Sequence, residues 1–223
     1  RDNLEHPSIA IDIPGHGKST FNNLQEEYSY KDLRSELYLC LREMNINKIH
    51  LCGYSMGGRI AISFAQKYPD LIKSLILESS SLGISNIDEK NEKFEDDMII
   101  SNSIIESMDN FNNKWKENEL FKYQKIRNEA EYKKQDIVRK SHNSKQLSKS
   151  LLSFSKGKMP AFEESFALFN FPVFLINGHD DTKYIKMNRD MMKVHKKAQQ
   201  FIINNASHNV HLENNELYLD TIQ

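Results

Sequence analysis

The stretch Gly53-Tyr54-Ser55-Met56-Gly57 decides the fold class of this chain. An apolar run at 48–52 precedes it and predicts a buried strand, and a helical pattern follows at 59–68. A G-x-S-x-G sequence between a strand and a helix is typical of a nucleophile elbow, in which glycines permit a sharp turn and leave the serine hydroxyl exposed. A glycine-rich connection with a capping serine is the alternative, but it does not account for glycines at 53, 57 and 58 in a chain that has only eight. We therefore expect Ser55 to act as a nucleophile or a base.

Strand and helix patterns alternate on both sides of this motif. Strand patterns cover 8–13, 74–78, 172–177 and 200–203, and helix patterns cover 30–44 and about 184–197. This alternation favours a mostly parallel sheet flanked by helices, with right-handed crossovers. The middle of the chain is rich in Asn, Lys and Glu and contains helical patches, which predicts an inserted helical cap. We expect residues 1–85 and 171–223 to form the α/β core and residues 86–170 to form the cap.

A serine hydroxyl needs an imidazole beside it to act at neutral pH, and usually a carboxylate that orients the imidazole. The strand at 172–177 runs into Gly178-His179-Asp180-Asp181, and the strand at 200–203 is followed by His208. The order Ser, Asp, His along the chain is that of α/β-hydrolases. His208 is therefore the expected catalytic histidine, with His211 in reserve. From spacing alone, either Asp180 or Asp181 supplies the carboxylate, and the other is solvated or caps the next helix.

Arg59 lies in the first turn of the helix that follows the serine. A cation there opposes the helix dipole by about 0.3–1 kcal/mol, a cost that a bound anion would offset. The alternative is an arginine that is exposed or paired with a nearby carboxylate. The residues alone leave both interpretations open.

Composition limits the choice of partners. The chain has 223 residues, with 30 Lys and Arg against 31 Asp and Glu, so its net charge of -1 gives no electrostatic footprint for nucleic acid or an anionic membrane. We expect one catalytic domain and a small-molecule partner. No apolar run approaches the roughly 18 residues of a membrane span, and no signal peptide opens the chain. Cys40 in a helix and Cys52 in a buried strand are expected to be free thiols, which favours the cytoplasm.

Several motifs resemble the MenH family of the α/β-hydrolase superfamily, the 2-succinyl-6-hydroxy-2,4-cyclohexadiene-1-carboxylate synthases of menaquinone biosynthesis. The stretch Asp12-Ile13-Pro14-Gly15-His16-Gly17-Lys18-Ser19 resembles a turn common to many hydrolases. More specific to the family are Tyr54 before the serine, Arg59 after two glycines, and Glu78-Ser79-Ser80-Ser81-Leu82-Gly83, where leucine replaces the usual proline. The resemblance extends over nearly the whole chain.

Further motifs of the same family lie in the cap and near the C-terminus. Phe111 with Trp115, followed by Leu120-Phe121, resembles its F-x-x-x-W and L-F pattern, and Arg139 precedes Asn143 as a cap arginine does in the family. The stretch 178–184 resembles G-x-x-D-x-K-[FY], which implies Asp181 as the triad aspartate. The stretch 208–214 resembles H-N-x-H-x-E-[ND], which supports His208 over His211.

The resemblance implies a carbon-oxygen lyase that eliminates pyruvate from a cyclohexene carboxylate without a cofactor or metal, the triad serving as the base. Tyr54, Arg59, Trp115 and Arg139 are then expected to contact an anionic carboxylate substrate, because arginine suits bidentate carboxylate recognition. Lys93 stands where the family tends to have another arginine. The backbone N–H of Met56 is the expected oxyanion donor.

Two other functions remain open at this stage. One keeps the triad but makes the enzyme a hydrolase of ester or carbon-carbon bonds that acts through an acyl-enzyme; the other is a non-catalytic binding protein of the same fold. The family's first strands and its H-G oxyanion segment have no counterpart before Ser8, so we expect the sequence to be a partial version of the protein. The oligomeric state is not predicted.

Overall fold

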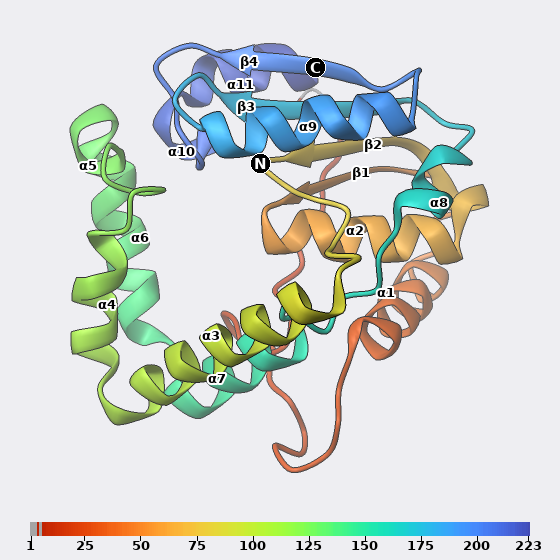
Figure 1. Ribbon diagram of the computed structural model, residues 1–223. Helices are drawn as coiled ribbons and strands as arrows, with labels where there is room; N and C mark the ends of the chain where they lie inside the picture. Colours follow the sequence, from red (N-terminus) through yellow and green to blue (C-terminus); the bar gives the residue numbers. More distant parts are fainter. Residues whose placement is uncertain (1–3, 5) are drawn as a thin grey trace.

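Four parallel strands form the sheet at the centre of the computed structural model, which describes residue 4 and residues 6–223. The strands lie in the order β1 (Ile49–Tyr54), β2 (Ile72–Glu78), β3 (Val173–Gly178) and β4 (Gln199–Ile203) (Figure 1). Cys52 pairs with Ile76, Leu77 with Leu175, and Ile176 with Phe201. Because the strands are parallel, all four carboxyl ends lie at one edge of the sheet, and the loops that follow them meet there. The parallel sheet expected from the sequence is confirmed.

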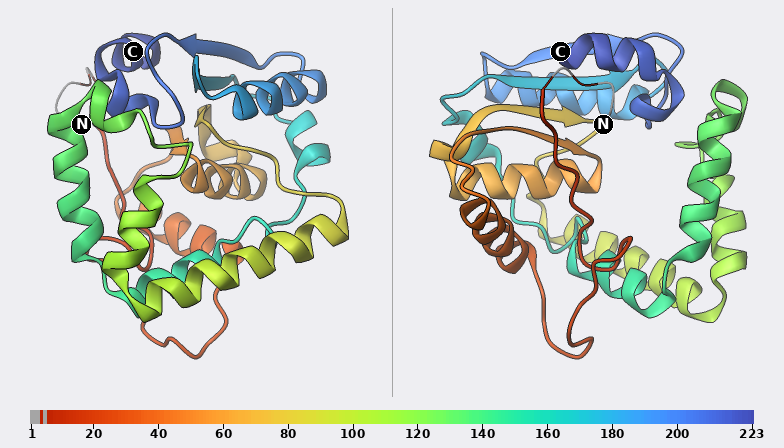
Figure 2. Two further views of the ribbon diagram at one scale, coloured as in Figure 1. Left: turned by 60° about the vertical axis from the view of Figure 1, so that its left-hand side comes forward. Right: turned by 180° about the vertical axis from the view of Figure 1, so that it is seen from behind.

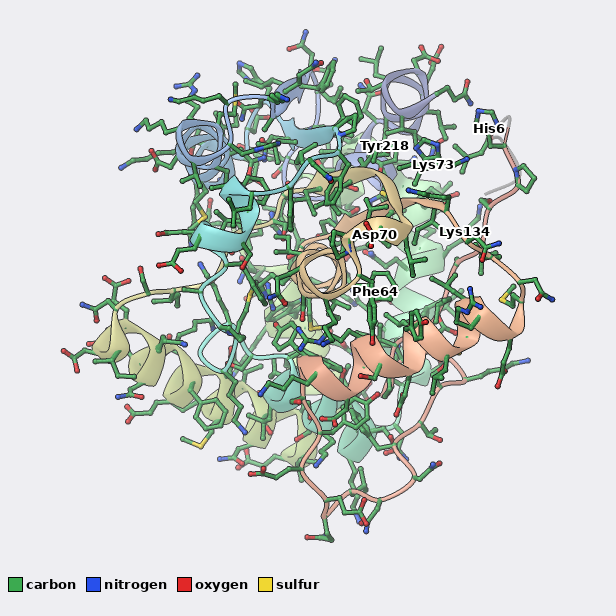
Figure 3. All side chains as sticks on the ribbon, turned by 90° about the vertical axis from the view of Figure 1, so that its right-hand side faces the viewer. His6, Phe64, Asp70, Lys73, Lys134 and Tyr218 are labelled. Atoms are coloured by element: carbon green, nitrogen blue, oxygen red, sulfur yellow. The ribbon has the colours of Figure 1, made fainter. Side chains whose placement is uncertain are left out.

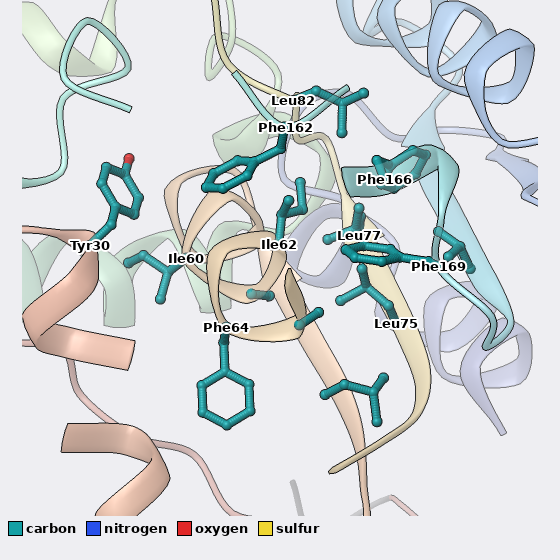
Figure 4. Packing of buried hydrophobic residues seen from close by; sticks show 14 of the residues in the cluster. Tyr30, Ile60, Ile62, Phe64, Leu75, Leu77, Leu82, Phe162, Phe166 and Phe169 are labelled. Atoms are coloured by element: carbon teal, nitrogen blue, oxygen red, sulfur yellow. The ribbon is translucent and has the colours of Figure 1, made fainter. Parts of the chain in front are cut away.

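Successive side chains of each strand point to opposite faces of the sheet, and both faces are buried. Leu75, Leu77 and Leu175 contribute to the larger apolar core, together with the buried side chains of α2 (Figure 4). Ile76 and Ile176 belong to a second, smaller cluster on the opposite face. This burial on both faces is the reason that β2 and β3 have nearly continuous apolar sequences.

Helices cover the two faces unequally. The face with the larger core is covered by α1 (Tyr30–Glu43), α2 (Met56–Lys67) and α9 (Thr182–Val194), whereas the short helices α10 (Val210–Glu213) and α11 (Asn215–Ile222) lie on the other (Figures 1 and 2). A short 3-10 helix, η1 (Pro69–Leu71), leads from α2 into β2. Figure 3 shows the two sides: Phe64 projects from α2 toward α1, and Tyr218 lies beyond the sheet on α11.

The chain between β2 and β3 is helical, as the sequence predicted. It forms α3 (Ile87–Glu106), α4 (Met108–Lys116), α5 (Gln124–Arg127), α6 (Glu129–Ser141), α7 (Ser144–Ser153) and α8 (Glu163–Ala167). Helices α3 and α7 lie side by side, and α4, α5 and α6 form an arm that rises toward α10 (Figures 1 and 2). Asn and Ser side chains cap most of these helices: Asn86, Ser107, Asn128 and Asn143 each accept a bond from a first-turn N–H. The Asn-rich composition of this segment therefore has a structural role.

Two expectations about the sheet are wrong. Residues 8–13 form no strand, and Ile9 and Ile11 are about half exposed, because this segment pairs with none of the strands in the described part of the chain. Strand β1 is the edge strand of the described sheet and is only partly buried, so Cys52 is exposed, as is Cys40. Both cysteines are free thiols. Among the described helices, none is long and apolar enough to cross a membrane.

Candidate active site

The turn between β1 and α2 holds Ser55 in a backbone conformation that few residues other than glycine adopt. Its φ is 48° and its ψ is -107°. Three hydrogen bonds fix this turn: the Ser55 N–H donates to the Glu78 carbonyl at 2.8 Å, and the Ser55 carbonyl accepts from the Ser80 hydroxyl at 3.0 Å and the Arg59 N–H at 3.2 Å. A strained serine at a strand-to-helix turn is the geometry expected of a nucleophile elbow.

Two glycines make this sharp turn possible. A Cβ at Gly53 would lie 2.5 Å from the Gly57 carbonyl oxygen, and one at Gly58 would lie 2.5 Å from the Ser80 side chain. Gly57, by contrast, has nothing within 4 Å of such a Cβ. The glycines at 53 and 58 are therefore required by close packing, which the motif alone did not distinguish.

Ser55, His208 and Asp181 form a hydrogen-bonded chain. The Ser55 Oγ lies 3.1 Å from His208 Nε2, and His208 Nδ1 lies 2.9 Å from Asp181 Oδ2. His208 and Asp181 are buried, with exposed fractions of 2% and 3%. Since an ionised carboxylate only accepts hydrogen bonds, the proton sits on Nδ1 and leaves Nε2 free to take the serine proton. This is the arrangement that a serine needs to act as a nucleophile or base.

The loops after β3 and β4 contact each other closely, and this contact brings Asp181 and His208 together. The His179 and Asp180 N–H groups donate to the carbonyls of Ile203 and Ala206. Gly178 lies so close to the second loop that a Cβ there would be 2.2 Å from the Ser207 carbonyl oxygen. Gly178 is thus the residue that lets the two catalytic loops approach each other.

The structure separates the alternatives that the spacing left open. Asp180 hydrogen-bonds to His179 and pairs with Arg127, and these contacts lower the pKa of Asp180. It does not contact the triad histidine, which Asp181 does. His211 lies against the buried carboxylate of Glu78, with its Nδ1 2.8 Å from Glu78 Oε2. Neither Asp180 nor His211 belongs to the chain of hydrogen bonds from Ser55.

Aromatic rings surround the triad histidine. The rings of Tyr184, Tyr54 and Phe121 have centroids 4.6, 5.3 and 6.0 Å from that of His208. Trp115 does not contact His208 directly; its ring lies 5.6 Å from that of Phe121. These rings exclude water from the imidazole, and burial raises the pKa of Tyr54 and Tyr184, so both phenols stay neutral and able to donate hydrogen bonds.

Two of the expected arginines lie near this site without an ion-pair partner among the described residues. Arg59 donates from Nε to the Tyr30 hydroxyl at 3.2 Å and from Nη2 to the Phe154 carbonyl at 3.1 Å. Arg139 lies over the Phe121 ring, 5.6 Å from its centroid, and its buried Nη1 has no hydrogen-bond partner in the described chain. Burial lowers the pKa of Arg139. Neither guanidinium is paired with a carboxylate of the described chain, and each keeps N–H donors that an anion could accept from.

Of the other expected contacts, Lys93 already has an acidic partner, whereas the Met56 N–H has none within its helix. Lys93 is paired with the buried Asp97, so its ammonium is already partly neutralised. Met56 is the first residue of α2, and its N–H, like other first-turn N–H groups, has no partner within the helix. That N–H lies at the positive end of the α2 dipole, where it suits a developing oxyanion.

Sequence reasoning missed several residues that shape the site. Tyr184 stands one helical turn after Asp181, and this spacing was a usable signal that its ring lies beside the triad. Glu78 stood in a quoted motif, but nothing in that motif indicated its pairing with His211. Arg127 joins the cap helix α5 to Asp180 and Glu213, a contact between residues far apart in the sequence. No local pattern predicts it.

The model of the alpha/beta hydrolase fold family matches residues 2–215. A nucleophile elbow, a Ser-His-Asp chain and a parallel sheet with an inserted helical segment agree with that match, and the chain belongs to the α/β-hydrolase family.

Similarity to individual proteins is more specific. A Bacillus subtilis protein that carries the name 2-succinyl-6-hydroxy-2,4-cyclohexadiene-1-carboxylate synthase is 30% identical over 94% of this chain and 77% of its own length. The synthase of that name from Enterobacter sp. is 26% identical over 94% of this chain and 78% of its own length. The structure of MenH from S. aureus superposes with a TM-score of 0.88 at 26% identity, covering 95% of this chain and 80% of that one. Within the α/β-hydrolases the chain belongs to this synthase family, as its motifs suggested.

Proposed function

We propose that the protein eliminates pyruvate from 2-succinyl-5-enolpyruvyl-6-hydroxy-3-cyclohexene-1-carboxylate to give 2-succinyl-6-hydroxy-2,4-cyclohexadiene-1-carboxylate. The observation that carries this proposal is the Ser55-His208-Asp181 chain beside two guanidiniums that lack a carboxylate partner in the described residues. Such a site combines a base with positive charge for an anionic substrate. The names of the similar synthases give the same product, 2-succinyl-6-hydroxy-2,4-cyclohexadiene-1-carboxylate.

In the proposed mechanism, Ser55 removes the ring proton at C2, next to the succinyl ketone, while His208 accepts the serine proton at Nε2. Asp181 stabilises the resulting imidazolium. The electron pair of the broken C–H bond forms the C2–C3 double bond, the C3–C4 double bond shifts to C4–C5, and the C5–O bond breaks. The enolate of pyruvate leaves and is protonated to pyruvate. No acyl-enzyme forms.

Charge and exclusion of water favour this step. Removal of the C2 proton places negative charge on the succinyl ketone oxygen, which the Met56 N–H is positioned to stabilise. Arg59 and Arg139 bind carboxylates of the substrate, and residues 86–170 act as the cap that covers it. The site places Arg59 and Arg139 on different elements, α2 and α6, so a substrate bound between them is held from both core and cap.

The test is pyruvate release from enzymatically prepared substrate, compared between the protein, Ser55→Ala, and buffer alone to measure spontaneous elimination. We expect Ser55→Ala to lower kcat by about 10²–10⁴, the usual contribution of a positioned base. His208→Ala should lose a similar factor. Release from Ser55→Ala at the rate of the unmodified protein would contradict the mechanism, and a covalent adduct trapped on Ser55 during turnover would indicate a hydrolase instead.

A further inference from the structure

The segment after α7 carries a lysine beside the site that neither the motifs nor the mechanism uses. Lys156 is half-buried and has no hydrogen-bond or ion-pair partner in the described part of the chain. Two residues earlier, the Phe154 carbonyl accepts from both Arg59 Nη2 and the Tyr30 hydroxyl, the latter at 2.7 Å. These bonds tie the backbone before Lys156 to the arginine that follows the elbow.

The backbone around Lys156 is held in place on its other side as well. The Ser155 hydroxyl donates to Asp97 Oδ2 on α3 at 2.8 Å, and the Gly157 N–H donates to the Ser155 Oγ at 3.0 Å. A Cβ at Gly157 would lie 2.4 Å from the Lys90 carbonyl oxygen, so this segment packs directly on α3. Lys156 is therefore anchored between α2 and α3 and is not a lysine on a loose surface loop.

The charges that face Lys156 are mostly of its own sign. Arg59 on α2, Lys183 on α9 and Lys93 on α3 all repel it, and Glu89 on α3 is the acid that acts in the opposite direction. Asp97, also on α3, is engaged by Lys93 and Ser155. Burial, followed by these like charges, lowers the pKa of Lys156 to about 8. Burying an ammonium among cations is unfavourable, and an anion bound between them would remove the cost.

We propose that Lys156 and Arg59 together bind one carboxylate of the substrate, with Lys183 adding charge at the rim of this subsite. Arg59 supplies a planar pair of donors, and Lys156 supplies a point charge on the opposite side of the carboxylate. The subsite lies beside the base, since the backbone N–H of Arg59 donates to the Ser55 carbonyl at 3.2 Å. Lys156 is a binding residue, distinct from the base.

This inference rests on the proposed function for the identity of the ligand, but it is tested separately by binding. The probes are 2-succinylbenzoate, which retains the two carboxylates of the ring product, and pyruvate, which retains the third. Isothermal titration with each compares the protein with Lys156→Met and with Lys158→Met. Lys158 is the matched control because it is exposed and its ammonium lies over the Phe94 ring, 4.7 Å from the centroid.

We expect Lys156→Met to weaken binding of one probe by about tenfold or more, and Lys158→Met to leave both affinities unchanged. In turnover, Lys156→Met should raise KM with little change in kcat, because the lost contact exists in the ground state as well as in the transition state. Lys156→Arg should restore affinity. It should also remove the fall in kcat/KM above a pH of about 8 that titration of Lys156 imposes on the unmodified protein.

Unchanged affinity for both probes and unchanged KM in Lys156→Met would overturn the subsite. If instead the protein releases no pyruvate but Lys156→Met still loses affinity for a probe, the subsite stands and the proposed reaction is wrong. A lysine that only covers apolar surface would give equal binding in Lys156→Met and Lys158→Met.

Discussion

At the scale of single residues, the geometry of the triad depends on glycines, which have no side chain, as well as on the three side chains that form it. Asp181 and His208 come from loops separated by a helix and a strand, and the two loops reach hydrogen-bond distance only because Gly178 has no side chain. The strained serine has a similar requirement for the bare backbone of Gly53 and Gly58. The chemistry of this site therefore depends on glycines that carry out no chemistry.

Gly178→Ala tests this dependence. Its methyl group would overlap the Ser207 carbonyl, next to His208, so the loop must move. We expect a loss of about 1–3 kcal/mol in the free energy of unfolding, the usual cost of overpacking, together with a fall in kcat. Urea denaturation and pyruvate release measure the two effects. Gly57→Ala is the control for stability, since its methyl group meets nothing within 4 Å and a helical alanine is favoured over glycine. Equal stability of the two variants would contradict the argument.

The pair of His211 and Glu78 predicts a pH dependence of stability. Burial disfavours protonated His211, but the charge and hydrogen bond of Glu78 outweigh it, so the pKa of His211 is raised above its ordinary 6.5. The folded protein holds this proton more tightly than the unfolded chain. The pair therefore stabilises fully below the unfolded pKa, and this stabilisation is lost as the pH rises through the folded pKa.

We expect the difference in unfolding free energy between the unmodified protein and His211→Gln to shrink as the pH rises above the ordinary histidine pKa of 6.5 and through the raised pKa of folded His211. Its size should be about 1 kcal/mol, because the His211 side chain remains 33% exposed and water screens the pair. Denaturant unfolding at several pH values gives this difference. A difference that grows with pH would show that the sign is wrong.

At the scale of elements, Arg127 is the charged link between the cap and the loops that hold Asp181 and His208. Arg127 at the end of α5 pairs with Asp180 after β3 and with Glu213 of α10, whose side chain is fully buried. Glu213 also accepts a hydrogen bond, at 2.9 Å, from the backbone N–H of Ser207, which directly precedes the triad histidine. Asn128 adds a bond from its side chain to the Leu212 carbonyl. Contacts of the cap thus reach the loop that holds His208.

Removal of Arg127 should release this end of the cap. In Arg127→Met, Glu213 is left buried without its cation, and breaking a buried pair costs about 3–5 kcal/mol. We expect that loss in unfolding free energy and faster hydrogen exchange in α5 and α6. Lys125→Met, on the exposed side of the same helix, should change neither. Because the cost arises from an unpaired buried charge, Arg127→Met with Glu213→Gln should recover part of the stability, and no recovery would contradict the pairing.

Elements were the most predictable level of this molecule. Strands β2, β3 and β4 and helices α1 and α9 begin and end within a few residues of the predicted ranges, because two-faced burial and helical spacing are local patterns. The predicted strand at 8–13 failed since an apolar run becomes a strand only with a hydrogen-bonded neighbour. The elbow and the order of Ser55, Asp181 and His208 were also readable, because the fold fixes which strand each residue follows.

At the scale of the whole molecule, the missed residues share one property: their partners are distant in sequence. The folded chain brings distant segments together in three cases. Arg127 pairs with Glu213, Glu78 pairs with His211, and Lys156 is repelled by Arg59. The overall composition also gives no indication of the positive charge near Ser55. The whole chain has a net charge of -1, yet Arg59 and Arg139 lie near Ser55 without an ion-pair partner in the described residues, and Lys156 is repelled by Arg59. Global charge balance therefore does not predict local charge balance.

This local excess of positive charge predicts how a ligand stabilises the protein. A dianion such as 2-succinylbenzoate would relieve the repulsion, and binding to the folded state alone stabilises by about 2.7 kcal/mol at about 100 times Kd. We expect it to raise the Tm at low ionic strength and to raise it much less in about 1 M NaCl, where the Debye length falls to about 3 Å. The dimethyl ester of the same compound, which keeps its shape but carries no charge, should raise the Tm little at either salt concentration. Equal shifts with the ester and the dianion would mean that apolar contact with the rings around His208, not charge, holds the ligand.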